Sequence, residues 1–348
     1  MSLQVPATAT LAIILATGWL SGGLATPDLP NAESVSKTIT RMPGDELWPS
    51  WGPGGTHIVF AASQSGDWDI FTAKADGSDM RAIAPSPGID RHPRWTRDGQ
   101  IVFESRRSGN DDVYVVNADG SELRQLTTNP AAEGAGAMSP LGDHVAFSSR
   151  RGGAVWELYT LGLRGGVERR LATSPQGAVA HSWKPDGTAL AFMAGAPGNW
   201  DIYTAPVDGS GAVPLVATAN SETAPQWSPD GKTLLFTRAE GTRRNLFLKH
   251  MPAGDERQLT ALEGGVQWSS WCADGCAAVF ALGAQGQEDL HAVRIEDGKV
   301  FRLTADKGRE ISPSCDARGR VVYSSGRDGE LDLRLLTIPE YSWSNGQR

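Results

Sequence analysis

The hydrophobic and polar positions of the chain repeat with a period of about 44 residues. The repeat is marked by anchor positions, five of which hold tryptophan: Trp51, Trp95, Met138, Trp183, Trp227, Trp271 and Cys315. Eight or nine residues after each anchor comes an aromatic side chain: Phe60, Phe103, Phe147, Phe192, Phe236, Phe280 and Tyr323. Twelve residues before each anchor lies an aliphatic one: Ile39, Ile83, Leu126, Leu171, Leu215, Leu259 and Leu303. A repeat of this regularity governs any further interpretation.

Each copy predicts four short strands, as the copy around Trp227 shows. Strand a ends near the anchor, and Pro229-Asp230-Gly231 forms a turn because Pro fixes φ and Gly tolerates positive φ. Strands b, c and d follow at 234–237, 246–250 and 257–260. One such sheet cannot cover both of its apolar faces, whereas a ring of sheets can. We therefore predict an all-β, seven-bladed β-propeller of four-stranded antiparallel blades, with six blades as the alternative because copies three and seven depart from the pattern.

The last copy has no fourth strand of its own, since the chain ends in Asn345-Gly346-Gln347-Arg348. Residues 35–40 precede the first anchor without a blade of their own, so we expect them to pair with 331–336 and close the ring. This assigns one propeller domain to residues 35–340, a short linker to 26–34 and a C-terminal tail to 341–348.

Residues 1–25 lie outside the repeat and have the pattern of a signal peptide. An apolar run at 11–16 is followed by Gly23-Leu24-Ala25, which suits cleavage after Ala25. We therefore expect a periplasmic or secreted protein. No later segment is long and apolar enough for stable membrane insertion. The net charge of −8 disfavours nucleic acid as a partner, and we expect a monomer.

Of the three cysteines, Cys272 and Cys276 flank the Asp-Gly turn of the sixth copy. They are expected to face each other across this hairpin, which makes a disulfide between them possible in an oxidising compartment. Cys315 replaces an anchor tryptophan and is expected to be a small buried residue.

The repeat resembles that of TolB-type β-propellers, in which Pro-x-Trp-Ser-Pro-Asp-Gly precedes an apolar strand and Gly-x-x-Asp-Ile-Tyr follows. The best copies here are Pro225-Gln226-Trp227-Ser228-Pro229-Asp230-Gly231 and Gly198-Asn199-Trp200-Asp201-Ile202-Tyr203. The resemblance covers about residues 35–340 and concerns the propeller part alone. It implies either an interaction protein of the cell envelope, the propeller of a prolyl-oligopeptidase-like peptidase, or a sugar lyase with a metal in its central channel. No Gly-x-Ser-x-Gly motif is present, which disfavours the peptidase.

Five residues before the anchors, acids occupy five of the seven equivalent positions: Glu46, Asp90, Glu133, Glu222 and Glu310. We name these five residues the acidic collar, because the loops between blades should bring them to the channel mouth. They could bind a cation, for which oxygen ligands favour Ca²⁺ or another divalent ion, or a basic segment of a partner. Alternatively, each could pair with an arginine of its own face or cap backbone amides. The arginines on that face are Arg106, Arg150, Arg238 and Arg327.

Candidate catalytic chemistry is sparse. Only His92 and His181 among the six histidines fall near the inner start of strand a, in copies two and four, which should lie apart on the ring. No Ser/His/Asp order and no phosphate loop is visible, so no catalytic residue is assigned. The sequence favours a non-catalytic module that binds an envelope or extracellular protein or peptide, without a cofactor. The alternative is a carbohydrate-active lyase or hydrolase with a metal at the channel.

Overall fold

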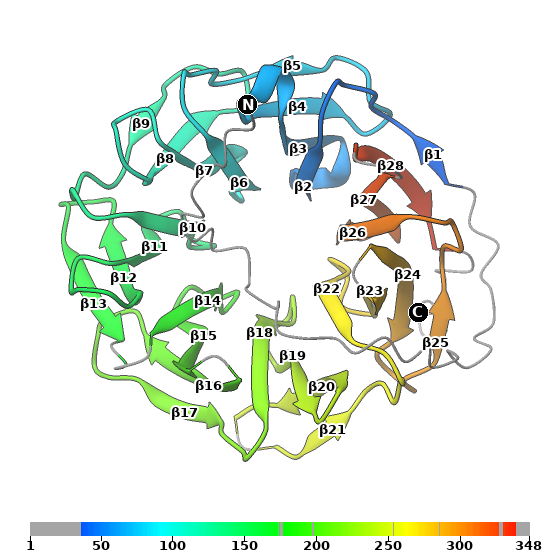
Figure 1. Cartoon of the computed structure of the whole chain (residues 1–348). Helices are drawn as coiled ribbons and strands as arrows, with labels where there is room; N and C mark the ends of the chain where they lie inside the picture. Colours follow the sequence, from blue (N-terminus) through cyan, green and yellow to red (C-terminus); the bar gives the residue numbers. More distant parts are fainter. Residues whose placement is uncertain are drawn as a thin grey trace, which may run out of the picture.

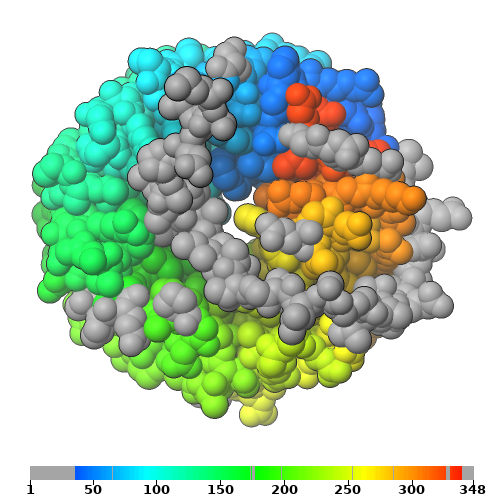
Figure 2. All heavy atoms as spheres, viewed as in Figure 1, coloured from blue at the N-terminus to red at the C-terminus, as the bar shows by residue number. Residues whose placement is uncertain are grey.

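The computed structural model describes residues 36–172, 174, 177–196, 198–252, 254–284, 286–326 and 330–338. They form seven four-stranded antiparallel sheets arranged as a ring (Figure 1). Figure 2 shows an opening at the centre of this ring. The prediction of seven blades is confirmed, and the six-bladed alternative is wrong. The predicted signal peptide, the linker and the tail at 341–348 lie outside the described residues.

The strands of each blade run in the order a, b, c, d from the channel outward (Figure 1). Strands a are β2 (Glu46–Trp51), β6 (Asp90–Trp95), β10 (Glu133–Met138), β14 (Ala178–Trp183), β18 (Ser221–Trp227), β22 (Val266–Trp271) and β26 (Arg309–Cys315). Strands b are β3 (His57–Ala62), β7 (Gln100–Ser105), β11 (His144–Ser149), β15 (Ala189–Ala196), β19 (Thr233–Glu240), β23 (Ala277–Ala284) and β27 (Arg320–Gly326).

Strands c are β4 (Asp69–Lys74), β8 (Asp112–Asn117), β12 (Glu157–Gly162), β16 (Asn199–Pro206), β20 (Arg243–His250), β24 (Gln287–Arg294) and β28 (Asp332–Thr337). Strands d are β5 (Arg81–Ala82), β9 (Arg124–Gln125), β13 (Glu168–Ala172), β17 (Val213–Val216), β21 (Glu256–Gln258), β25 (Val300–Arg302) and β1 (Lys37–Thr38). Two short 3-10 turns, η1 (Pro53–Gly55) and η2 (Gln64–Gly66), flank β3. The d–a and b–c loops share one side of the ring, which we call the upper face, and the a–b and c–d turns share the lower face.

The two ends of the propeller meet in blade 7, where β1 pairs with β28 as predicted. Lys37 lies opposite Leu335, and the hydroxyl groups of Ser36 and Tyr323 are 2.6 Å apart. The fourth strand of the last blade is thus supplied by the first described segment, which leaves no open sheet edge at the joint.

An aromatic pair lies in the core of six of the seven blades. The repeated aromatic residue of strand b is fully buried in every blade and in six blades lies against a ring from strand c. In blade 6 that partner is His291, whose ring centroid lies 5.6 Å from that of Phe280. Burial lowers the pKa of His291 to about 4, so the imidazole is neutral near pH 7.

The anchor tryptophans join neighbouring blades. Trp51 Nε1 donates to the Ser314 carbonyl of blade 7 at 3.0 Å, and Trp183 Nε1 donates to the Ala137 carbonyl of blade 3 at 2.9 Å. The residue after an anchor contacts the next anchor, since a Cβ on Gly52 would lie 3.0 Å from the Trp95 ring. Each anchor therefore packs onto the strand a of the preceding blade.

The disulfide lies at this same contact between neighbouring blades. The predicted Cys272–Cys276 pairing is wrong. Cys272 is bonded to Cys315, and their Cα atoms lie 4.5 Å apart. Cys272 follows the anchor of blade 6, and Cys315 is the anchor of blade 7, so the bond replaces the usual tryptophan contact. Cys276 remains in the turn, where its thiol lies 3.9 Å from the Asp274 carbonyl.

Every strand a carries the same irregularity, in that its pairing with strand b shifts register after the second or third residue. At this bulge one residue has a φ between 51° and 55° in all seven blades: Trp48, His92, Ala135, Ala180, Ala224, Trp268 and Ser312. Such φ values are unusual for residues other than glycine, so the bulge is a fixed feature of the repeat.

Among the described residues, no helix is long and apolar enough to span a membrane.

We expect His291→Phe to stabilise the protein increasingly as the pH falls below 6.5. Between pH 6.5 and about 4 the unfolded chain binds a proton that the buried imidazole does not, so the native protein loses about 1.4 kcal/mol per pH unit from this group. Phenylalanine removes this loss. Thermal melting of both proteins between pH 4.5 and 8 measures the effect, with the exposed His57→Phe as control. A constant difference in melting temperature across this range would contradict it.

Candidate functional site

The five residues of the acidic collar are fully buried at the start of strand a, or at its second residue in blades 5 and 7. In blades 1 and 7 the carboxylate accepts the hydroxyl of a threonine from its own d–a loop: Thr40 bonds Glu46, and Thr304 bonds Glu310. Glu46 also accepts the amides of Met42 and Leu333 at 3.0 and 2.8 Å. These two acids thus hold the d–a loop against strand c.

In blades 2, 3 and 5 the collar carboxylate forms an ion pair with an arginine of the same blade. Arg107 bonds Asp90 at 2.8 Å, Arg238 bonds Glu222 at 2.8 Å, and Arg151 bonds Glu133. The partners are not all those expected from the sequence. Arg106 instead pairs with Asp111 at 2.7 Å, and Arg150 lies over the ring of Trp156 at 4.5 Å. Arg327 lies outside the described residues.

Burial has clear electrostatic consequences for two collar residues. It raises the pKa of Asp90 to about 6, although Ser105 and Arg107 act against it. Burial raises the pKa of Glu310 to about 7, and the charges of Asp289 and Asp306 add to the rise. The collar carboxylates are therefore engaged by the propeller itself, with an arginine of the same blade in blades 2, 3 and 5 and with the loop that arrives from the preceding blade in blades 1 and 7.

A different polar cluster lies at the channel between blades 2 and 3. Its centre is Glu104, which is 2% exposed. The Glu104 carboxylate accepts Arg91 Nε at 3.0 Å and the Ala135 amide at 2.5 Å, and its Oε1 lies 3.1 Å from His92 Nδ1. Burial would raise the pKa of Glu104, but His92, Arg91 and the amide outweigh it and lower the pKa to about 2. Glu104 is therefore a carboxylate whose two oxygens are both occupied.

Two glycines of blade 3 make room for side chains of blade 2. A Cβ on Gly134 would lie 3.2 Å from the Glu104 carboxylate, and one on Gly136 would lie 2.4 Å from Val113. The glycines of the third copy are thus required by packing against blade 2, Gly134 by Glu104 and Gly136 by Val113.

The predicted site residues His92 and His181 lie on β6 and β14, and only His92 contacts Glu104. The His92 ring lies 4.2 Å from that of Trp48, which in turn contacts Trp68. Burial and the charge of Arg94 lower the pKa of His181 to about 4. The two histidines belong to blades 2 and 4. Neither Arg94 nor Glu104 was singled out from the sequence, because neither belongs to the repeat.

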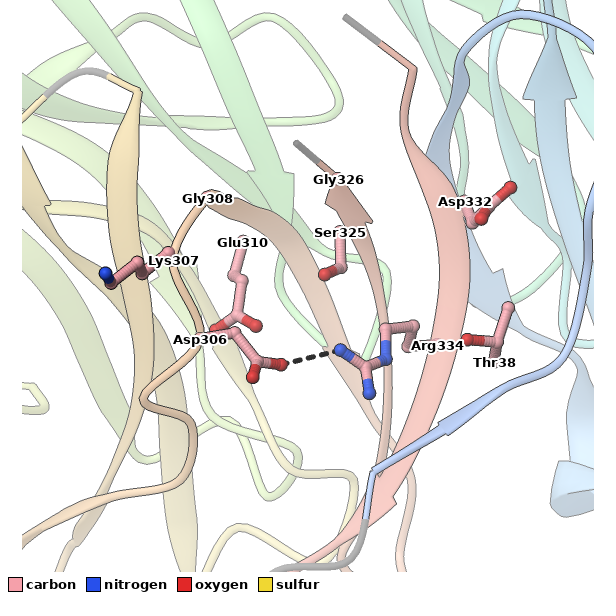
Figure 3. Close-up of a pocket in the computed structure, with 9 residues that line it drawn as sticks. All are labelled: Thr38, Asp306, Lys307, Gly308, Glu310, Ser325, Gly326, Asp332 and Arg334. Atoms are coloured by element: carbon pink, nitrogen blue, oxygen red, sulfur yellow. Dashed lines mark hydrogen bonds and ion pairs between the residues drawn. The ribbon is translucent and has the colours of Figure 1, made fainter. Parts of the chain in front are cut away.

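A cleft of about 200 Å³ opens in blade 7 beside Glu310 (Figure 3). An ion pair between Asp306 and Arg334, 2.6 Å long, spans it, and Ser325 and Lys307 complete part of its lining. Because Glu310 is fully buried and Asp306 and Arg334 are already paired, the cleft offers few groups to a ligand.

We expect Arg238→Ala to lower the free energy of unfolding by about 3 kcal/mol, because it leaves the charge of Glu222 buried and unpaired. Chemical denaturation measures the loss. Arg243→Ala, which breaks an exposed pair with Glu263, is the matched control and should cost under about 1 kcal/mol. Adding Glu222→Gln to Arg238→Ala should restore part of the stability. Equal losses in the two single variants would contradict the internal role of the collar.

Three solved structures show how widely this fold is used. An oligogalacturonate lyase in complex with manganese is 15% identical and has a TM-score of 0.71, over 90% of this chain and 100% of its own. A putative TolB from Agrobacterium tumefaciens is 19% identical with a TM-score of 0.53, over 64% and 83%. A puromycin-hydrolyzing peptidase from Mycobacterium tuberculosis is 16% identical with a TM-score of 0.69, over 88% and 54%. At these identities the likeness concerns the fold. No curated protein matches the sequence.

The manganese of the lyase complex raises the question whether this channel suits such an ion. Among the residues that the structure describes, no three His, Cys, Asp or Glu side chains are placed to hold one metal. His92 Nδ1 already faces Glu104, and each collar carboxylate has at least one oxygen engaged by an arginine or a d–a loop, in a separate blade from the others. The described donor groups therefore do not fit a channel metal.

A family model described as the TolB beta propeller domain matches residues 29–153 and 124–267. Together the two matches extend over more than half of the chain and over the copies with the clearest Trp-Ser-Pro-Asp-Gly pattern. The chain belongs to the family of TolB beta propeller domains.

Proposed function

We propose that this protein is an exported, non-catalytic propeller of the cell envelope that binds another protein or a peptide on its upper face. The observation that carries the proposal is the placement of the tryptophans that are not anchors. Five of these are described and all are half-buried: Trp68, Trp156 and Trp200 at the upper ends of strands c, and Trp48 and Trp268 at the bulge of strand a. Tryptophan is one of the residues enriched where proteins bind one another.

The outer members of this set form a patch at the seam between blades 3 and 4. A Cβ on Gly177 would lie within 3.8 Å of the Trp200 ring and 3.7 Å of the Trp156 carbonyl. Arg150 stacks on the other ring of the pair at 4.5 Å. Neither Trp156 nor Trp200 belongs to a core cluster of the described residues, so blade packing does not account for them.

The rival function, a lyase or hydrolase acting on carbohydrate at a channel metal, has less support. The lyase and peptidase structures share the fold, but fold alone does not carry an activity. Among the described residues no group of side chains is placed to hold a metal. The buried collar carboxylates instead form hydrogen bonds with loop residues or ion pairs with arginines. What the upper face offers is aromatic surface, which suits binding.

We expect the double variant Trp156→Ala/Trp200→Ala to weaken partner binding about tenfold or more, because truncating such side chains removes central contacts. The measurement is crosslinking of the purified protein to envelope extracts, with quantitative mass spectrometry of the captured proteins. The control is Leu141→Ala/Val167→Ala, which removes two exposed apolar side chains from the lower face. A protein that the wild type, the tryptophan variant and the control variant capture equally does not bind the upper face. If every captured protein is of this kind, the proposal fails.

Export is tested separately. We expect the protein recovered from the periplasm or medium of a Gram-negative host to begin at Thr26, after removal of the predicted signal peptide. Intact-mass measurement decides this. A mass that includes Met1, with the protein retained in the cytoplasm, would exclude the envelope location.

A further inference from the structure

A contact at the outer rim of the lower face recurs from seam to seam. In this contact a side chain of strand d lies beside the c–d turn of the next blade. Arg81 Nη2 of blade 1 donates to the Ala118 carbonyl of blade 2 at 3.4 Å, and Arg257 Nη1 of blade 5 donates to the Glu296 carbonyl of blade 6 at 3.2 Å. The charge of this strand-d residue is therefore felt at the start of the next turn.

The two positions that face each other have opposite charges in four seams. The first lies two residues before the repeated aliphatic residue, and the second lies two residues after the end of strand c. They hold Lys37 and Asp76, Arg81 and Asp119, Arg169 and Asp208, and Arg257 and Glu296. At the seam of blades 4 and 5 both residues are apolar, Val213 and Pro252. A base is thus matched with an acid, and an apolar residue with another apolar residue.

Three of the charged pairs interact electrostatically. Hydrogen bonds from a nearby serine lower the pKa of the turn aspartate in blades 1, 2 and 4, and the charge of the facing base lowers it further. In blade 4 a Cβ on Gly209 would lie 3.9 Å from Arg169 Cδ of blade 3. The contact between strand d and the next turn is thus a regular part of the fold.

The seam of blades 2 and 3 is the exception, because both positions hold arginine: Arg124 on β9 and Arg164 in the turn after β12. Both side chains are exposed, and among the described residues neither takes part in an ion pair or a hydrogen bond. Of the acids nearest to them in the chain, Glu168 pairs with Arg151, and Glu122 forms no ion pair within the described part of the protein. Like charges repel, so the attraction found at the other seams does not account for this pair.

The turn of blade 3 also stands clear of blade 2. In blades 1, 2 and 6 a Cβ on the turn glycine would lie 1.8, 2.6 or 2.9 Å from a carbonyl oxygen of the preceding blade: Gly77, Gly120 and Gly298. A Cβ on Gly165 or Gly166 would meet no atom within 4 Å. Space at this seam is therefore open where other seams have a close backbone contact.

Two exposed aliphatic side chains flank the arginines. Leu123 directly precedes Arg124 and is 40% exposed, and Val167 follows Arg164 in the same turn and is 52% exposed. In the described part of the chain, large apolar side chains with such exposure occur only on the lower side of blades 1 to 4: Met80, Leu123, Leu141, Val167 and Val213. We name Arg124, Arg164, Leu123 and Val167 the lower seam patch. It combines two guanidinium groups with apolar surface that the fold leaves uncovered.

We propose that the lower seam patch binds an acidic segment of a second protein, in which acids alternate with aliphatic residues. The planar guanidinium groups match carboxylates through paired hydrogen bonds, and Leu123 and Val167 offer apolar contacts to the side chains between the acids. A membrane surface fits less well, because the net charge is −8 and exposed aspartates stand on the turns around the patch: Asp76, Asp119, Asp186 and Asp208. These charges repel a continuous negative surface.

This surface is separate from the tryptophans of the upper face. Strands β9 and β13 lie at the outer rim of the ring (Figure 1), and the patch is at their lower ends. A partner that binds there leaves Trp156 and Trp200 free, so the inference stands apart from the proposed function.

The test is titration calorimetry at low salt with two peptides, acetyl-Glu-Leu-Glu-Leu-Glu-amide and its neutral counterpart acetyl-Gln-Leu-Gln-Leu-Gln-amide. We expect the acidic peptide to bind the wild-type protein about tenfold more tightly, and this preference to weaken at high salt because the charges are exposed. Arg124→Gln and Arg164→Gln should each remove most of the preference. Arg81→Gln, at the equivalent position of blade 1, is the matched control and should leave it unchanged.

Arg164→Asp gives this seam the acid that the other charged seams have. We expect it to abolish the preference and to raise the melting temperature, since an Arg–Asp pair replaces two like charges. Thermal melting also verifies that each variant is folded. An acidic peptide that binds no more tightly than the neutral one, or a preference that Arg81→Gln lowers as much as Arg124→Gln does, would overturn the patch. So would Arg124-dependent binding to phosphatidylglycerol vesicles by a protein that binds neither peptide.

Discussion

The structure depends on one constraint, which is that no blade can bury its own two faces. Each four-stranded sheet exposes an apolar surface on both sides, and only the sheets next to it can cover these surfaces. The anchor tryptophan provides this contact, since its indole lies on the preceding blade and in blades 1, 4 and 6 donates to a carbonyl there. Because every blade relies on its neighbours, the ring must close, which explains why the short strand β1 completes blade 7.

The disulfide is a consequence of the same constraint. In blade 7 the anchor is Cys315, which is too small to cover the preceding blade as tryptophan does. The residue that an anchor contacts is the one that follows the previous anchor, and in blade 6 this residue is Cys272. A covalent bond thus replaces packing at the seam next to the ring closure. The 43-residue separation of the two cysteines, one less than the usual period, could have shown this pairing in the sequence.

The sequence predicts the fold well because each repeated feature has a single structural role. Phe236 is buried inside its blade, and Thr260 accepts the Leu246 amide at the start of a d–a loop. The acidic collar was harder to interpret, since strand order places Glu222 near the channel mouth but does not say which way its side chain points. The left-handed residue of the bulge lies two positions further on, and the carboxylate turns into the blade toward Arg238. Backbone geometry, which the pattern of residue types does not encode, decides this.

The same reasoning indicates where a function specific to this chain must be sought. Side chains that recur in most copies form hydrogen bonds, ion pairs or packing contacts inside the propeller, as the collar carboxylates do. Side chains that differ between copies are not constrained in this way. Ser50, Ala137 and Ser182 are small at the position where blade 2 has Arg94, and Ala135 and Ala224 stand where blade 1 has Trp48. These exceptions lie on the innermost strands of the ring, so a regular scaffold presents an irregular set of groups along its channel.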